Sequence, residues 1–176
     1  GLGIPLEALI SEETTSQSRV AEDALDWSKF PVREMQKRGW LPTPKGQAQL
    51  EDLVRSFLGR VSFDAASTAH YRRTFRGEAL DPKAYYSTIA WTARVLIRAR
   101  ERLPSTKFEG AKITADVMRE LGRLSWFLEG PMLAKEFIEK YGVVLIIEPR
   151  LPNTLLDGAA MITDTGVPVI GLTLRH

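Results

Sequence analysis

The chain has 176 residues, of which 44% are hydrophobic, so it can bury a core in one domain or in two small ones. It contains no Cys, which excludes disulfides and thiolate metal sites and favours a reducing cytoplasm. No apolar run approaches the roughly 18 residues of a membrane span, and the N-terminal residues lack the pattern of a signal peptide. We therefore expect a cytoplasmic protein that does not enter a membrane.

The net charge is only +2, but the charges are unevenly distributed. Residues 1–30 carry six acids against two basic residues, whereas residues 31–102 carry fourteen Lys and Arg against seven Asp and Glu. A basic segment can face nucleic acid or an acidic partner. Because its charges are interleaved with acids, we interpret this segment as a solvated helical surface and keep direct DNA binding as a weaker alternative.

The first 60 residues predict short helices joined by a polar linker. A helical turn is expected after Pro5, and residues 11–26 are polar enough for a linker. Pro31 starts and Gly39 ends a predicted helix of about two turns. An amphipathic helix follows, ended by Gly59, with these apolar residues at helical spacing: Leu50, Leu53, Val54, Phe57 and Leu58.

Four more helices are expected before residue 143. The first spans residues 64–75. The second opens at Asp81 and Pro82 and is closed by Pro104; its buried side is predicted to hold Tyr86, Ile89, Ala93, Leu96 and Ile97, and its outer side Arg94, Arg98 and Arg102. The third has an apolar stripe formed by Ile113, Val117, Leu121, Leu124 and Leu128. The fourth runs from Pro131 to Gly142, with Leu133, Phe137, Ile138 and Tyr141 inward.

Three strands are expected at the end of the chain, over residues 143–147, 158–162 and 167–174. The last two are joined by the turn at residues 163–166, and Asp157 with Gly158 predicts a tight turn before the second strand. Pro168 favours an edge position for the third strand. Helices followed by strands predict an α+β fold: a mostly helical N-terminal and middle region, then a small three-stranded sheet.

Residues for hydrolytic or metal chemistry are few. The two histidines, His70 and His176, have no second ligand at helical spacing, and the chain contains no H-E-x-x-H, G-x-S-x-G or phosphate-binding loop. We interpret Glu109, Glu120, Glu129 and Glu148 as single solvated carboxylates, and Tyr85, Tyr86 and Trp91 as core residues. No catalytic, cofactor-binding or metal-binding residue is therefore assigned, and these 176 residues are not expected to be an enzyme.

Three stretches resemble one family. They are Asp26–Met35 continuing through Gly39–Leu41, Ala66–Arg100 with His70–Arg73 and Ala90–Trp91, and the C-terminal set Leu151–Pro152, Leu156–Ala160 and Pro168–Arg175. Together they cover nearly the whole chain and are similar to bacterial Xre-type regulators fused to an ImmA/IrrE-like zinc peptidase domain, often described as HigA-like antitoxins. The C-terminal stretch carries the most specific part of the resemblance.

The resemblance implies a domain division. Residues 1–26 would be the tail of a DNA-binding helix-turn-helix domain and a linker, residues 27–105 a helical connector, and residues 106–176 the αβββ start of a zincin-like peptidase domain. In the family the last strand is followed by a helix bearing H-E-x-x-H, which supplies zinc ligands and the general base. This chain has no such motif, so zinc is expected only in a longer parent protein.

Two functions follow from the resemblance, and both stay open at this point. In the first, the chain is the central part of a transcriptional regulator or antitoxin and contacts a cognate toxin or repressor protein, as a homodimer that reaches DNA only through the missing helix-turn-helix. In the second, it is half of a zinc metallopeptidase that cleaves a repressor or itself. There the third strand, as a sheet edge, would take a peptide substrate. An incomplete peptidase half would leave strand edges and apolar surface exposed, which predicts self-association or stabilisation by the missing helix.

Overall fold

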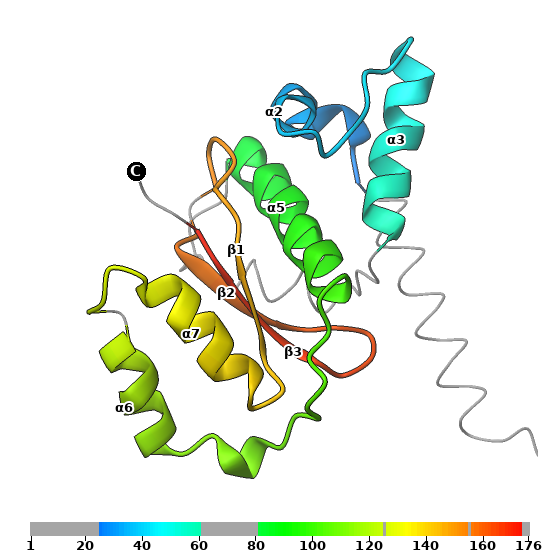
Figure 1. Cartoon of the computed structure of the whole chain (residues 1–176). Coiled ribbons are helices and arrows are strands. Elements are labelled where there is room, and N and C mark those ends of the chain that lie inside the picture. The colour runs from blue at the N-terminus through cyan, green and yellow to red at the C-terminus, as the bar shows by residue number, and fades with distance from the viewer. Residues whose placement is uncertain (1–24, 61–80, 125, 155, 174–176) are drawn as a thin grey trace, which may run out of the picture.

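A computed structural model describes residues 25–60, 81–124, 126–154 and 156–173. The fold is α+β, as expected: helices come first and a small sheet follows (Figure 1). The helices are α2 (Val32–Lys37), α3 (Gln47–Gly59), α5 (Pro82–Arg100), α6 (Ala115–Leu124) and α7 (Gly130–Glu139), with 3-10 turns η1 (Trp27–Lys29) and η2 (Gly110–Lys112). The strands are β1 (Val144–Ile147), β2 (Gly158–Ile162) and β3 (Pro168–Leu172). The helix expected over residues 64–75 and the turn after Pro5 lie outside the described residues.

The helix boundaries follow the capping residues of the sequence. The Asp81 side chain accepts a hydrogen bond from the Lys83 backbone N–H, and Pro82 occupies the first turn of α5. Gly39 after α2 and Gly142 after α7 have φ values of 69° and 76°, a left-handed conformation that favours glycine. At Gly142 a side chain would also clash, because a Cβ would lie 2.5 Å from the backbone nitrogen of Phe108.

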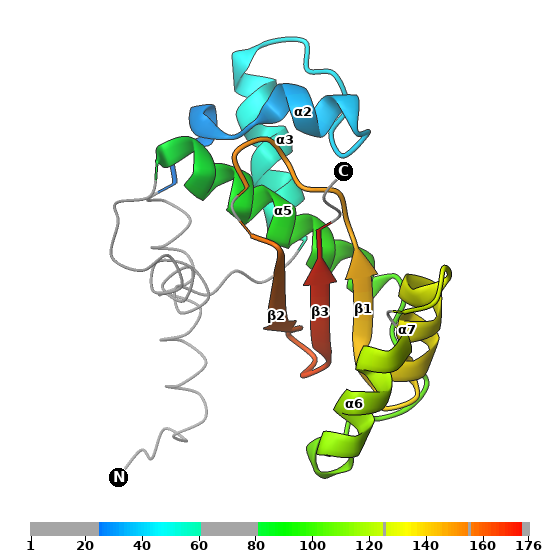
Figure 2. The ribbon, with the colours of Figure 1, turned by 90° about the vertical axis from the view of Figure 1, so that its left-hand side faces the viewer.

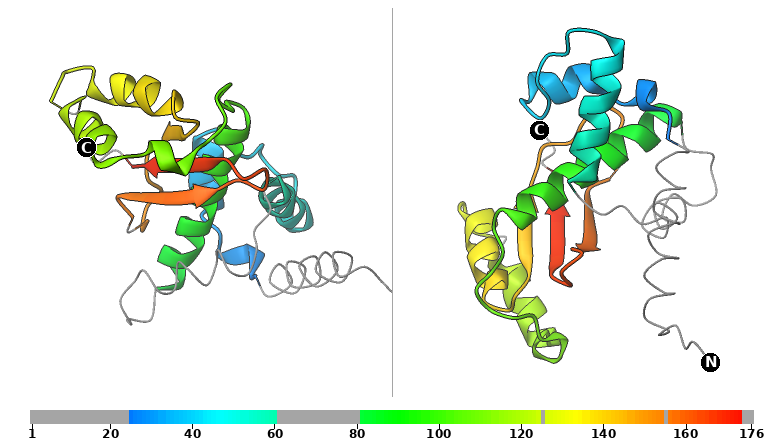
Figure 3. Two further views of the ribbon diagram at one scale, coloured as in Figure 1. Left: turned by 90° about the horizontal axis from the view of Figure 1, so that it is seen from below. Right: turned by 90° about the vertical axis from the view of Figure 1, so that its right-hand side faces the viewer.

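The elements form layers around the sheet. Helix α5 covers one face, and α2 and α3 lie on the other side of α5, away from the strands (Figures 1 and 3). Helices α6 and α7 lie on the opposite face, where α7 packs against β1 (Figure 2). The sheet is therefore sandwiched between helices along β1. Among the described residues, strand β3 contacts the core on the α7 side only through Ile170, and β2 is the strand farthest from α7.

The strand order is β1-β3-β2, with β3 parallel to β1 and antiparallel to β2. The expectation that β3 is an edge strand is therefore wrong, because β3 pairs on both sides. Pro168 is tolerated because it is the first residue of β3, opposite the last residue of β2, Ile162. The predicted hairpin turn at residues 163–166 is confirmed, and Gly166 there has a φ of 79°.

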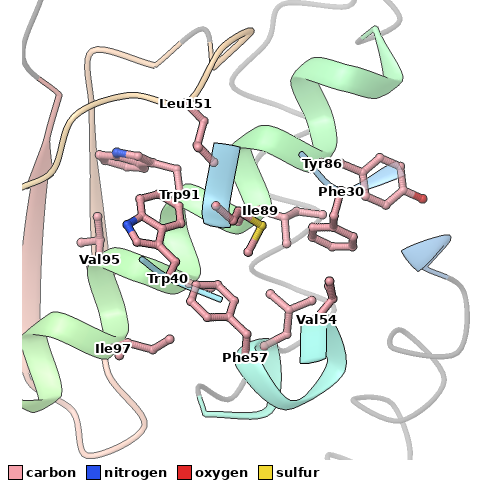
Figure 4. Packing of buried hydrophobic residues seen from close by; sticks show 14 of the residues in the cluster. Phe30, Trp40, Val54, Phe57, Tyr86, Ile89, Trp91, Val95, Ile97 and Leu151 are labelled. Carbon is pink, nitrogen blue, oxygen red and sulfur yellow. The ribbon is translucent and has the colours of Figure 1, made fainter. Parts of the chain in front are cut away.

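One hydrophobic core joins the helical part to the sheet. It contains Phe57 of α3, Trp91 of α5, Val144 of β1 and Val169 of β3, together with Leu151 from the β1–β2 connection. Figure 4 shows Trp91, Val95 and Ile97 of α5 in one cluster with Trp40, Val54 and Phe57 from the preceding helical part. The core thus includes residues from both sides of the expected division between residues 105 and 106, and that division stays a prediction.

Two details of the helix predictions are wrong. Arg94 and Arg98 do not lie on an outer face of α5, because both turn towards the end of β1, and the helix is buried on almost every side. Leu128 does not continue the apolar stripe of α6, since the helix ends at Leu124 and Leu128 is fully exposed. The core positions predicted for Tyr86 and Trp91 are confirmed, and Tyr85 is half-buried.

Candidate protein-binding surface

The described carboxylate most removed from solvent is Glu148, which directly follows β1. It is 6% exposed, and its Oε2 accepts a hydrogen bond of 2.7 Å from Nη1 of Arg98. Nε of Arg94 lies 3.8 Å from the same oxygen. Trp91 donates from Nε1 to the Glu148 carbonyl at 3.0 Å, so three residues of one helix hold the end of β1. The interpretation of Glu148 as a solvated carboxylate is wrong.

Sequence spacing offered one signal for this cluster. Trp91, Arg94 and Arg98 are three and four residues apart, and such spacing places side chains on one helical face. Nothing in the sequence names Glu148 as their partner, because it lies fifty residues after Arg98. The contacts join α5 to the strand end around a carboxylate that is nearly inaccessible to solvent, so we regard the cluster as a structural junction.

Arginines of the basic middle segment contact groups within the chain. Arg38 donates to the carbonyl oxygens of Pro149 and Arg150 at 2.8 and 2.7 Å. Arg100 donates to the Arg60 carbonyl and forms an ion pair of 2.6 Å with Asp164. Together with Arg94 and Arg98, these side chains tie loops and strands to helices. These four described arginines are therefore engaged within the chain, whereas Arg72, Arg73 and Arg76 of the same segment lie outside the described residues, so direct DNA binding stays an untested alternative.

The other candidate carboxylates are exposed, as expected. Glu109 pairs with Lys112 and Glu120 with Arg123, each at a spacing of three residues. Glu129 is exposed beside the start of α7. These groups are far less buried than Glu148, and exposed pairs of this kind contribute little to stability.

The zinc that the resemblance implies finds no matching ligand set in the described ranges. No three His, Asp or Glu side chains there lie close enough together to hold a metal ion. His70 and His176 lie outside the described residues. No residue is therefore assigned to a metal.

The apolar face of β3 and β2 opposite α5 has little described cover. Alternation places Ile170 and Leu172 of β3 on this face, and the register places Ala160 beside Ile170. Ile162 is 70% exposed and Leu172 is 40% exposed, although Ile170 still contacts the smaller core of α7. Figure 2 shows α6 and α7 to one side, with both strands facing the viewer. We call Ala160, Ile162, Ile170 and Leu172 the open face.

A shallow hollow adjoins the open face. Its volume is about 420 Å³, and Met132 and Lys135 of α7 and Ile147 of β1 contribute to its lining. Ile147 pairs with Leu172 in the sheet, so the hollow is next to the open face. A floor of strands beside a wall formed by α7 can receive an apolar element of another protein. The sequence predicted the strands but not this exposure, which depends on where α7 lies.

Comparison of the chain with protein-family models, curated proteins and solved structures finds no match. Among the described helices, none combines the length and the apolar character that crossing a membrane requires.

Proposed function

We propose that this chain is the regulatory, protein-contacting part of a bacterial transcriptional regulator of the antitoxin type, and that it works by binding a partner protein. The partner would be a cognate toxin or a repressor. The observation that carries the proposal is the open face: apolar side chains of two strands stand exposed beside a wall of α7. Contiguous exposed apolar surface of this kind commonly marks a protein-interaction site. The regulator assignment itself rests on the sequence resemblance.

The internal use of charged residues also supports binding over catalysis. The buried Glu148 is held by two arginines and is 6% exposed. A carboxylate held in this way stabilises a strand end, and its ion pairs are not those of a free acid or base. Contact with a protein requires only the exposed apolar surface and its polar rim.

The second function, half of a zinc metallopeptidase, has less support. Its structural argument was that a peptide would add to β3 as an edge strand, and β3 is the central strand. A peptide could pair only with an outer strand of this sheet. We therefore keep the peptidase as a property that the resemblance implies for a longer parent.

The test is co-expression of the chain with the protein encoded next to it, the natural candidate for a cognate toxin. We expect a stable complex, and we expect Ile162→Asp with Leu172→Asp to weaken its affinity about tenfold or more, because a charged side chain would replace an apolar one at the contact. The matched control is Leu103→Asp, an exposed apolar position outside the open face. Unchanged affinity in the double variant would sink the proposal.

A further inference from the structure

The turn between α6 and α7 exposes three consecutive large apolar side chains. Trp126 is 90% exposed, Phe127 60% and Leu128 102%. The backbone of this turn is hydrogen-bonded: the N–H groups of Trp126 and Phe127 donate to the carbonyls of Arg123 and Leu124 at 3.2 Å. The side chains of Trp126, Phe127 and Leu128 are thus presented to solvent from a stretch in which two backbone N–H groups are hydrogen-bonded. Exposing three such groups in succession costs free energy unless another surface covers them.

Met132 extends this surface onto the first turn of α7, where it is 66% exposed. We call Trp126, Phe127, Leu128 and Met132 the apolar tip. Scaled by these exposures, the four side chains offer on the order of 500 Å² of apolar area. That is close to the upper end for an apolar patch on an ordinary monomer, about 300–600 Å².

This area matches one side of a dimer interface. A standard interface buries about 800 Å² per partner, of which roughly 60% is apolar, or about 500 Å². The apolar tip supplies that apolar part by itself. Trp is also the side chain most often found among the few residues that dominate binding energy.

The charges near the tip suit a second copy of the same chain. In a two-fold dimer the same patch lies on both sides of the interface, so a net charge near the axis would face the same charge on the second copy and be repelled by it. The charged residues of α6 are paired within the helix, Asp116 with Arg119 at 2.5 Å and Glu120 with Arg123 at 3.2 Å. Glu129, which directly follows Leu128, is the one exposed charge inside the sequence range of the tip. In a tip-to-tip dimer it would have to lie at the solvated rim of the interface, away from the same residue of the second copy.

We propose that the apolar tip is the contact surface of a homodimer, in which two copies of this chain pack tip to tip around a two-fold axis. This inference goes beyond the proposed function and does not depend on it. Met132 belongs to the apolar tip and also lines the hollow beside the open face, so the two surfaces are tested through residues that they do not share: Trp126 and Leu128 for the tip, Ile162 and Leu172 for the open face.

The test is sedimentation equilibrium of the 176-residue chain, with a monomer mass of 19.7 kDa. We expect the wild type to be a dimer at micromolar concentration. Trp126→Gln with Leu128→Gln should raise the dimer dissociation constant about 30-fold or more, as loss of a central Trp does in other interfaces. Because both side chains are exposed in the monomer, the far-UV circular dichroism and melting temperature of the monomeric variant should show an intact fold.

The control is Leu172→Gln on the open face, which should leave the dimer intact. A wild-type monomer up to about 100 µM would overturn the proposal, since an interface of standard size binds more tightly than that. Equal dimerisation of the tip variant, dimer loss in Leu172→Gln, or association that grows without limit would overturn it as well. Since partner binding is assayed separately through Ile162 and Leu172, failure of the dimer leaves the proposed function standing.

Discussion

At the scale of single residues, the end of β1 depends on one buried carboxylate. Glu148 is nearly inaccessible, whereas the side chains of Arg94 and Arg98 keep 26% exposure each. Burial makes the arginines dependent on their partner, because a buried charge without an opposite charge is strongly destabilising. Partial contact with water reduces that penalty, because screening weakens the pairs.

We therefore expect Glu148→Gln to lower the free energy of unfolding by about 2–3 kcal/mol, since the amide keeps the shape but removes the negative charge. Urea denaturation monitored by tryptophan fluorescence measures the change. The matched control is Glu120→Gln, which removes an exposed pair and should cost less than about 1 kcal/mol. Equal effects in the two variants would show that the junction is energetically unimportant.

Asp26 supplies a pH-dependent contact at the start of the described chain. Its Oδ1 accepts hydrogen bonds from the hydroxyl and the N–H of Ser28, and its Oδ2 lies 3.2 Å from Nζ of Lys29. The Ser28 hydrogen bond, followed by that of Lys29, lowers the pKa of Asp26 below its ordinary value of 3.8. A lowered folded-state pKa adds stability above the unfolded pKa, and this stability is lost as pH falls through the folded pKa.

Ser28→Ala should raise the pKa of Asp26 towards 3.8, because the largest stabiliser of the carboxylate is removed. The pKa of Asp26 can be measured directly from the carbon-13 NMR chemical shift of its side-chain carboxyl group as a function of pH. Stability near neutral pH should change little, since the group is exposed. An unchanged pKa in the variant would contradict the assignment of Ser28 as the main cause.

At the scale of elements, the packing of α5 on the sheet depends on Gly171 in the central strand. A Cβ at this position would lie 2.9 Å from Cη2 of Trp91 and 3.0 Å from Cγ1 of Val95. Both side chains are fully buried, so neither can move without disturbing the core. The glycine thus lets the helix approach β3 closely.

Gly171→Ala should destabilise the fold by about 1–3 kcal/mol, as overpacking does in other cores. The matched control is Gly122→Ala in α6, where a Cβ meets nothing within 4 Å. That variant should gain about 0.5–1 kcal/mol, because Ala favours the helix. Thermal unfolding measures the change in stability of each variant. A change of the same sign in both variants would refute the packing argument.

The sequence predicts where helices and strands begin and end better than it predicts which of them pack together. Gly59, Gly142 and Pro82 mark helix ends because their backbone preferences act locally. Strand order does not follow from such local signals. Pro168 favours an edge strand, and only the register shows that it is the first residue of β3, a position where a proline is tolerated in a central strand. The partner of Arg98 and the exposure of Ile162 depend likewise on contacts between distant segments, so neither the junction nor the open face was predicted.

At the scale of the whole molecule, the layers α2–α3, α5 and sheet share one core (Figure 3). Val54 of α3 and Val144 of β1 belong to the same cluster although ninety residues separate them, and α5 lies between the two. Helices and strands that share buried side chains unfold together when no independent core remains. This predicts cooperative unfolding across the expected boundary at residue 105.

Val54→Ala tests that cooperativity, because Val54 is completely buried in α3. The variant should lose about 1–3 kcal/mol. If one core holds the molecule together, amide hydrogen exchange measured by NMR should accelerate by about the same factor, on the order of ten- to a hundredfold, in α3, α5, β1 and β3. Acceleration confined to α2 and α3 would mean that the helical part opens alone. In that case the open face and the apolar tip would belong to a unit that is stable without the first helices.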